Sequence, residues 1–338
     1  MAKSNFSITI SSRKLVVSLV SLLLFSINPL FAAEENWAAP RTEYGFPDLQ
    51  GIWHFGSTIP LQRPVELGTQ SVYTEAEALN IESEMVQRNQ ERERALDPNR
   101  SPPEAGASIG LEADYNFSTF RSNLPKVNGE YRTSIIIDPP DGRLPVREEF
   151  VDFRTRRLVL GKSNTDGPEN QPVSGRCIIF GAAVPSLGSI TFNSNMQIVQ
   201  NKDYVVLMTE MIHDARIIRL NDVHHDNGTQ YWMGDSVGHW EEDTLVVHTK
   251  NFRPEQSGGI RLSEAFDLVE RLTLVGDNEI LYAYTVTDEN AYTRPFTAER
   301  VITRRPVGDQ IYEFACHEGN YSMPNILTGA RRQETDSN

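Results

Sequence analysis

The second half of the chain consists of short apolar runs, rich in β-branched and aromatic residues, separated by turns rich in Gly, Asn, Asp and Pro. Runs of this kind predict β-strands. Several links between them contain only a few residues, and short links force neighbouring strands to run antiparallel. Because closing a sheet on itself removes its edges, eight or so such strands predict an all-β fold with an antiparallel barrel. The predicted strands cover residues 133–137, 196–200, 204–209, 215–220, 244–249, 268–275, 280–287, 296–304 and 311–316.

One earlier segment has helical rather than strand periodicity. Thr74 and Glu77 have the spacing of a capping box, and a narrow stripe of Ala, Ile and Met follows them at helical intervals. Charged residues fill the other faces, and three prolines follow the segment. The pattern predicts a surface helix over residues 73–96 that lies over a sheet.

The triplet Gly51-Ile52-Trp53 precedes this helix, after a loop-rich stretch. A Gly-x-Trp at the start of a first strand is similar to lipocalin-type barrels, in which the Trp plugs one barrel end. Any strand can carry such a triplet, so it supports a lipocalin-type barrel without proving one. The predicted fold is a lipocalin-like antiparallel barrel with an N-terminal extension that contains one helix.

The N-terminus has the pattern of a cleaved secretory signal. An apolar run of 11 residues, 15–25, follows Arg13 and Lys14, which is too short to span a bilayer core of about 30 Å. Cleavage is expected after Ala32 or Ala33, and a non-cleaved anchor is the alternative. The sequence therefore predicts a periplasmic or secreted protein. Its expected organisation is a signal peptide (1–33), an N-terminal extension (34–130) and a main barrel region (131–331) that forms one domain with the extension.

Composition restricts the partners of the mature chain. The 338 residues carry a net charge of −14, and loss of residues 1–33 removes three basic residues and no acids, which leaves −17. A chain of this charge is repelled by phosphate backbones and anionic lipids, which argues against nucleic acid as a partner. Outside the signal, no apolar run is long enough to insert into a membrane.

The two cysteines, Cys177 and Cys316, are 139 positions apart. In an oxidising compartment such a pair predicts a disulfide. A nucleophilic thiol is the alternative, although neither cysteine lies in a known nucleophile motif.

Long stretches of the chain resemble a large group of secreted bacterial proteins from proteobacteria and acidobacteria, most of which have no settled activity. The resemblance implies secretion and an all-β, lipocalin-like fold, and it implies no chemistry. The matching stretches are PDLQGIW (47–53), YRTSIIIDPPDGRLP (131–145), RC (176–177), MIHDARIIRL (211–220), WMGDSVGHWEEDTLVVHTKNF (232–252), YTRPFTAE (292–299) and IYEFACHEGNYSMPNILTGAR (311–331).

The segment that opens the predicted strand 215–220 is the first candidate for chemistry. Alternation along a strand places His213 and Ala215 on one face and Asp214 and Arg216 on the other. If the first face points into the barrel, His213 is a candidate general acid or base. If the second does, Asp214 and Arg216 form an ion pair that lines a cavity. A hydrogen-bonded structural histidine is the alternative.

A second candidate is the polar and aromatic segment 232–241. Asp235 and His239 could form an acid–base pair between the rings of Trp232 and Trp240. The alternative is a bulged strand whose Gly238 makes room for Trp240.

A third group of candidates lies toward the C-terminus. His317 and Glu318 follow Cys316, so a disulfide would hold this possible acid–base pair in place. Tyr292, Arg294 and Tyr321 are candidate substrate-binding residues, since a guanidinium binds a carboxylate with two hydrogen bonds. Capping, loop ordering and surface placement are the structural alternatives.

A metal site was the remaining possibility. His224, His225 and Asp226 are adjacent, but neighbouring side chains on an extended chain diverge. His213, His239 and His317 could instead converge as a three-histidine site. No P-loop, dinucleotide fingerprint, Gly-x-Ser-x-Gly elbow or His-Glu-x-x-His is present in the sequence.

These observations favour an enzyme without cofactor or metal that acts on a small apolar or aromatic molecule by acid–base chemistry, as a lyase, isomerase or hydrolase. A lipocalin-type binding protein for a small hydrophobic ligand is the alternative. In the enzyme, proton carriers, orienting carboxylates and substrate-binding groups are all required. The expected proton carriers are His213 and His317, the orienting carboxylates Asp214, Asp235 and Glu318, and the substrate-binding residues Arg216, Trp232, His239, Trp240, Tyr292, Arg294 and Tyr321.

Overall fold

A computed structural model describes residues 37–92, 98–99, 101, 122–179, 193–256 and 259–336. Ala39–Asn338 form one compact unit. The predicted signal peptide, residues 1–33, lies outside the described residues, as does the last part of the predicted helix. No helix among the described residues is long and apolar enough to cross a membrane.

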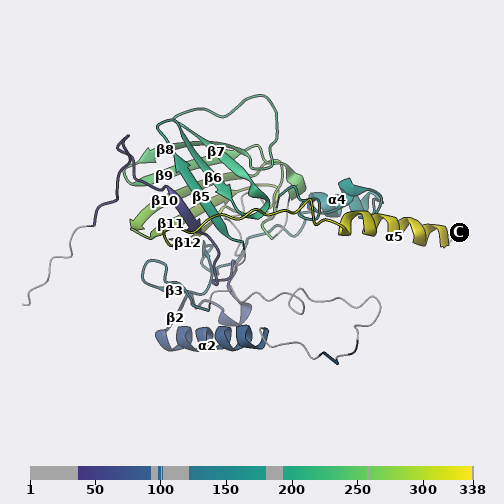
Figure 1. Cartoon of the computed structure of the whole chain (residues 1–338), viewed down its shortest axis with the longest axis horizontal. Coiled ribbons are helices and arrows are strands. Elements are labelled where there is room, and N and C mark those ends of the chain that lie inside the picture. Colours follow the sequence, from purple (N-terminus) through teal and green to yellow (C-terminus); the bar gives the residue numbers. More distant parts are fainter. Residues whose placement is uncertain are drawn as a thin grey trace, which may run out of the picture. The chain divides into compact units, whose positions relative to one another are not determined.

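Nine strands close into a ring, which confirms the predicted all-β barrel (Figure 1). β1 pairs with β5 on one side and with β12 on the other, and this second pairing closes the sheet. A short strand, β4 (Ile136–Asp138), adds to the outer side of β12. Around the ring the strands are β1 (Gly51–His54), β5 (Asn195–Gln200), β6 (Tyr204–Thr209), β7 (Ala215–Leu220), β8 (Asp235–Glu241), β9 (Thr244–Lys250), β10 (Asp267–Gly276), β11 (Glu279–Thr287) and β12 (Phe296–Arg304).

The prediction that all neighbours run antiparallel fails at one pair. β7 and β8 are parallel, with Ile218 opposite Ser236 and Leu220 opposite Gly238. A closed ring with an odd number of strands cannot alternate direction throughout, so nine strands require one such pair. Parallel neighbours also need a crossover between them. Residues 221–234 make this crossover, which the sequence pattern gave as an ordinary loop.

One predicted strand does not form. Residues 311–316 pair with no strand of the described chain and follow the barrel as irregular chain. The physical reason is that β12 pairs with β11 along one edge and with β4 and β1 along the other, so no edge is left for another strand there.

Alternation along the strands fills the barrel interior with large side chains. Trp53, Tyr282, Tyr284 and Phe296 are all at most 1% exposed and belong to one hydrophobic core. The Trp53 indole nitrogen donates a hydrogen bond to the Leu49 carbonyl at 2.7 Å, so its polar end is satisfied. Burial of each such ring stabilises the fold by about 2–3 kcal/mol.

The predicted capping box is present at the start of α2 (Glu75–Arg92). The Glu77 carboxylate accepts from the Thr74 backbone nitrogen at 2.7 Å, and the Thr74 hydroxyl accepts from the Glu77 nitrogen at 3.3 Å. This reciprocal pair fixes the first turn. The remaining elements are η1 (Val65–Leu67), β2 (Val72–Tyr73), β3 (Tyr131–Arg132), α4 (Phe153–Val159), η2 (Pro168–Asn170), η4 (Met211–His213), η5 (Pro254–Gln256) and α5 (Ser322–Asp336).

A disulfide joins Cys177 and Cys316, with their Cα atoms 5.8 Å apart, which confirms the predicted bond. No free cysteine is present, so the nucleophilic-thiol alternative is wrong. The disulfide packs against Met211 and Ile212 in a small apolar cluster. It ties residues 170–177 to the irregular segment that follows the barrel.

Candidate functional site

The predicted acid–base residues ahead of β7 lie outside the barrel interior. His213 ends η4, is exposed, and has a positive φ of 48°. Asp214 is half-buried, and its Oδ2 atom has no hydrogen-bond partner among the described residues. Burial raises the pKa of Asp214 to about 6, and the nearby charge of His213 opposes the rise only in part. Asp214 therefore holds a proton more readily than an ordinary aspartate.

Arg216 points into the barrel and is 2% exposed. Its two terminal nitrogens donate to the Glu270 carboxylate at 2.7 and 3.0 Å, and the Tyr282 hydroxyl donates to the same carboxylate at 2.7 Å. The structure therefore pairs Arg216 with Glu270, and not with Asp214 as the alternation had suggested. All of these groups are enclosed by the core.

The aromatic and polar residues of segment 232–241 separate rather than forming one wall. His239 is exposed and hydrogen-bonds Glu241 at 3.1 Å. Trp240 stacks on Phe46, with ring centroids 5.5 Å apart. Trp232 lies under the guanidinium of Arg253, which is a residue of another cluster. Asp235 is the predicted residue of this segment that meets an arginine and two histidines.

The C-terminal candidates also lie apart from one another. His317, Glu318 and Tyr321 are exposed near the disulfide. Tyr292 is 1% exposed, and its hydroxyl is engaged with the backbone of Arg261. Arg294 is paired with Asp138 at 2.6 Å on the surface.

No three His, Cys, Asp or Glu side chains within the described ranges are arranged to hold a metal ion. His213, His239 and His317 therefore do not form the three-histidine site that the sequence left open. The adjacent His224 and His225 instead bind a protein carboxylate.

Asp235 is the centre of the cluster that the structure does bring together. It is the first residue of β8 and is 3% exposed. Arg219 donates to its carboxylate at 2.8 Å, the His225 backbone nitrogen donates at 2.8 Å, and the His224 Nδ1 lies 3.1 Å away. Because the crossover 221–234 returns along the outer wall from β7 to β8, it carries both histidines over this carboxylate.

A chain of hydrogen bonds continues from Asp235 across the next two strands. His224 Nε2 lies 3.0 Å from His248 Nδ1, and His248 Nε2 lies 2.7 Å from the Asp267 carboxylate. Side chains alternate along a strand, and the register places Val237 and Val269 on either side of His248. Asp235, His248 and Asp267 therefore share the outer face of β8, β9 and β10.

The hydrogen-bonded series Asp235–His224–His248–Asp267 requires a definite number of protons. Each of its three hydrogen bonds needs one proton, whereas two neutral imidazoles supply only two. All three bonds form when the histidine pair takes up one further proton and carries one positive charge. The cluster is therefore built to accept a proton and to give it back.

The two ends of this chain differ in their electrostatics. Burial opposes ionisation of Asp235, but hydrogen bonds from Arg219, the His225 backbone and His224 outweigh it and hold its pKa at about 2. Burial lowers the pKa of His224, with hydrogen bonding to Asp235 opposing and the charges of His248 and Lys250 adding to the effect. The neutral form of His224 is thus favoured.

His248 is also the accessible member of the pair. Its side chain is 40% exposed, against 12% for His224. A neutral His224 that donates from Nδ1 to Asp235 offers Nε2 as an acceptor and so holds the His248 ring in one orientation. The arrangement gives a solvent-accessible imidazole that is oriented from behind by a second imidazole and a carboxylate.

Sequence reasoning identified Asp235 but missed His248 and treated His224 only as a metal ligand. The alternation within the predicted strand 244–249 already placed His248 opposite the apolar Val247 face. What the pattern lacked was the register that sets β8 against β9, and the parallel crossover that brings His224 alongside.

Comparisons of the chain with protein-family models and with curated proteins find no match. The fold alone assigns no activity, because barrels serve both enzymes and binding proteins. Function is therefore inferred from the geometry of the side chains.

Proposed function

We propose that the protein is an enzyme that works by acid–base chemistry, with His248 as the group that exchanges a proton with the substrate. The single observation that carries the proposal is the hydrogen-bonded chain Asp235–His224–His248–Asp267. A positioned imidazole typically contributes about 10²–10⁴-fold to the rate of a proton-transfer step. Reactions of the lyase, isomerase or hydrolase classes use such a step.

In this mechanism His248 gives or takes the proton at Nε2, which faces solvent and Asp267. His224 accepts a hydrogen bond from His248 Nδ1. Its own Nδ1 proton stays on His224 and is donated in a hydrogen bond to Asp235. Asp235 is thus a positioning residue, held ionised by Arg219. Asp267 holds His248 from the exposed side until a substrate displaces it.

The test is a turnover screen of small aromatic and aliphatic esters, lactones and hydroxy acids, followed by His248→Ala. We expect the variant to lose at least about a hundredfold in kcat/KM, since it removes the proton-transfer group. His239→Ala is the matched control, because His239 is an exposed histidine of the neighbouring strand that, among the described residues, hydrogen-bonds only Glu241. Asp235→Asn should shift the pH–rate profile while the enzyme still binds substrate.

A His248→Ala variant that folds and turns over at the parent rate would remove the basis of the proposal. Loss of activity in His239→Ala equal to that in His248→Ala would point to a general effect of the outer wall instead.

We also propose that the mature chain functions in the periplasm or outside the cell, in keeping with the secreted bacterial proteins that it resembles. The disulfide supports this, since such bonds persist in oxidising compartments. N-terminal sequencing of the mature chain tests it, with a first residue just after Ala32 or Ala33 as the expected result.

A further inference from the structure

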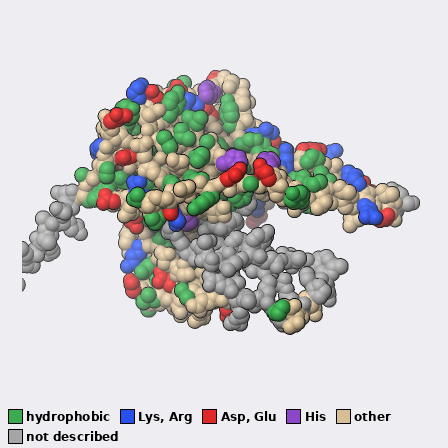
Figure 2. Space-filling model, viewed as in Figure 1, with side chains coloured by type: hydrophobic (Ala, Val, Ile, Leu, Met, Phe, Trp, Pro, Cys, Tyr) green, Lys and Arg blue, Asp and Glu red, His purple; other side chains and the backbone are tan. Residues whose placement is uncertain are grey.

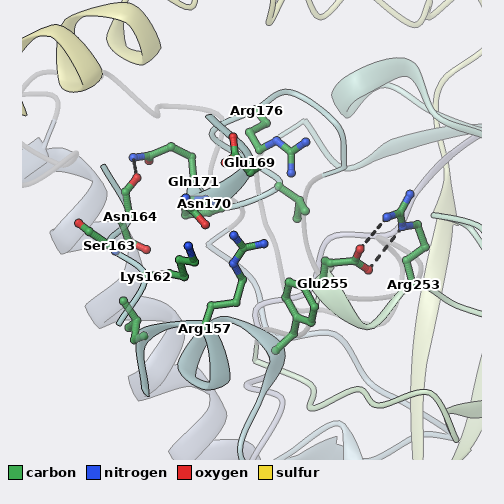
Figure 3. Close-up of a pocket in the computed structure, with 14 residues that line it drawn as sticks. Arg157, Lys162, Ser163, Asn164, Glu169, Asn170, Gln171, Arg176, Arg253 and Glu255 are labelled. Carbon is green, nitrogen blue, oxygen red and sulfur yellow. Dashed lines mark hydrogen bonds and ion pairs between the residues drawn. The ribbon is translucent and has the colours of Figure 1, made fainter. Parts of the chain in front are cut away.

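A cavity outside the barrel is lined by residues that have no role in the acid–base proposal. It lies between α4, residues 162–176 and residues 253–255, and has a volume of about 270 Å³ (Figure 3). This is near the lower end of ligand cavities, about 300–1,000 Å³, so an occupant of roughly one ring in size fits it.

The elements that form the cavity are fixed in place by their own contacts. The Asp152 carboxylate caps α4 by accepting from the Thr155 nitrogen at 2.9 Å. On the opposite wall, the disulfide at Cys177 holds the turn that carries Arg176, and Asn320 donates to the Gly175 carbonyl at 2.8 Å. The walls are therefore set before any ligand enters.

Positive charge gathers in this cavity although the chain as a whole is acidic. Four cations and two carboxylates line it, an excess of two positive charges in a chain of net charge −14. Figure 2 shows basic side chains elsewhere on the visible face spread among acidic ones. The cavity thus offers an anion a local potential opposite in sign to that of the protein.

One of the four cations is already neutralised. Arg253 bonds the Glu255 carboxylate at 2.6 Å and lies over the ring of Trp232, 4.4 Å from its centroid. Burial opposes ionisation of Glu255, but the hydrogen bond and charge of Arg253, together with the charge of Arg176, hold its pKa below the usual value. This pair closes one side of the cavity as a fixed wall.

The other three cations, Arg157, Lys162 and Arg176, have no carboxylate within ion-pair distance in the part of the chain that the structure describes. Arg157 is half-buried, and its Nε is buried without a hydrogen-bond partner among those residues. Figure 3 shows Arg157 and Lys162 extending into the cavity, with Arg176 across from them. The guanidinium of Arg157 therefore reaches the cavity without a carboxylate partner among the described residues, and its terminal nitrogens are the donors that an anion would meet.

The uncharged lining is half polar, from Ser163, Asn164, Asn170 and Gln171, and half apolar. Phe153, Leu158, Pro172 and Val173 line the same cavity, and the Phe153 ring lies 5.9 Å from the Arg157 guanidinium carbon. An inorganic anion would leave this surface wet, whereas an organic acid covers it and presents its carboxylate to the guanidinium donors.

We propose that this cavity binds a small organic acid as its carboxylate anion, with an apolar body of about one ring between Phe153, Leu158 and Val173. Arg157 and Arg176 bind the carboxylate, and Lys162 adds positive charge at the exposed side. The proposal does not depend on the acid–base role of His248.

Isothermal titration calorimetry of the full mature chain, disulfide intact and at low ionic strength, tests this with benzoate as the probe. Benzamide has the same shape without the charge, and inorganic phosphate has the charge without the apolar body. We expect benzoate to bind, benzamide to give no measurable binding, and phosphate to bind at least about tenfold more weakly than benzoate.

Variants locate the site. Arg157→Gln and Arg176→Gln should each weaken benzoate binding about tenfold or more. Lys162→Gln should weaken it less, and because Lys162 is exposed, this variant carries little risk to folding. Arg332→Gln, an equal change of charge at an exposed position of α5 that does not line the cavity, should bind as the parent does.

Three results would overturn the proposal: no heat with benzoate, equal binding of benzamide, or unchanged affinity in all three cavity variants. Phosphate binding tighter than benzoate would overturn the organic-acid assignment. Normal benzoate binding by His248→Ala is expected whether or not that variant loses turnover, so this experiment and the turnover test fail independently.

Discussion

The ion pair between Arg216 and Glu270 gives the strongest stability prediction for the barrel. Its exposed fractions are 2% and 0%, and both Arg216 terminal nitrogens bond the carboxylate, at 2.7 and 3.0 Å. Replacing Glu270 by Gln keeps the shape but leaves the Arg216 charge buried without a counter-charge. Removing one partner of a buried pair costs about 3–5 kcal/mol.

The assay is urea unfolding at pH 7 with the disulfide intact, followed by Trp fluorescence. The free energy of unfolding should fall by about 3–5 kcal/mol, and it changes with urea by about 3 kcal/mol per molar. The urea midpoint of Glu270→Gln should therefore fall by about 1 M or more. The expected loss of free energy is a large part of the total stability of a typical protein, about 5–15 kcal/mol.

A double variant separates the cost of the lone charge from the value of the pair. Arg216→Leu with Glu270→Leu removes both charges and the carboxylate to which the Tyr282 hydroxyl donates, and should lie within about 2 kcal/mol of the parent. Glu241→Gln is the surface control. Its partner Arg271 is the outward neighbour of Glu270, and the midpoint should hardly change because the pair is exposed.

The reasoning is refuted if Glu270→Gln shifts the midpoint no more than Glu241→Gln does. It is refuted equally if the double variant loses as much free energy of unfolding as the Arg216→Leu and Glu270→Leu single variants lose together, because the two charges would then act independently.

Two further predictions concern the region around the disulfide. Reduction of Cys177–Cys316 should lower the free energy of unfolding by about 5 kcal/mol, since the bond closes a loop of 139 residues, and thermal unfolding with and without a reductant measures this. The folded-state pKa of Asp214 is raised from 3.8 to about 6, so its favourable contribution is complete below pH 3.8 and is lost as pH rises through 6. Because Asp214 is only half-buried, solvent screening reduces the effect, and Asp214→Asn should stabilise the protein by about 1–2 kcal/mol at pH 8 and not at pH 3.5. An equal effect at both values would contradict the cause given for the shift.

Local pattern was enough for most of the strands and for the start of the helix. The β-branched runs that became β5, β6, β7 and β12 carry their own alternation, and the side chains of Thr74 and Glu77 are too close in sequence to miss each other. These are short-range effects, which sequence spacing contains directly.

The candidate site depends on pairing between distant segments, and local sequence patterns do not show which distant segments pair. His239 and His248 are both outward-facing histidines of neighbouring strands, and only the second lies where the crossover returns. Arg216 shows the same limit, because alternation left open which face points inward and could not predict Glu270, 54 residues away, as its partner.

The seam of the barrel makes its completion depend on β12, the last of the barrel strands along the chain. β1 finds one neighbour in β5 and the other in β12, where Trp53 lies opposite Arg304 and His54 opposite Thr303. Pairings that span so much chain are slow to form, because the intervening loop must first be closed. A nascent or truncated chain that stops before residue 296 therefore has two unpaired strand edges, on β1 and β11, that are open to strands of other molecules.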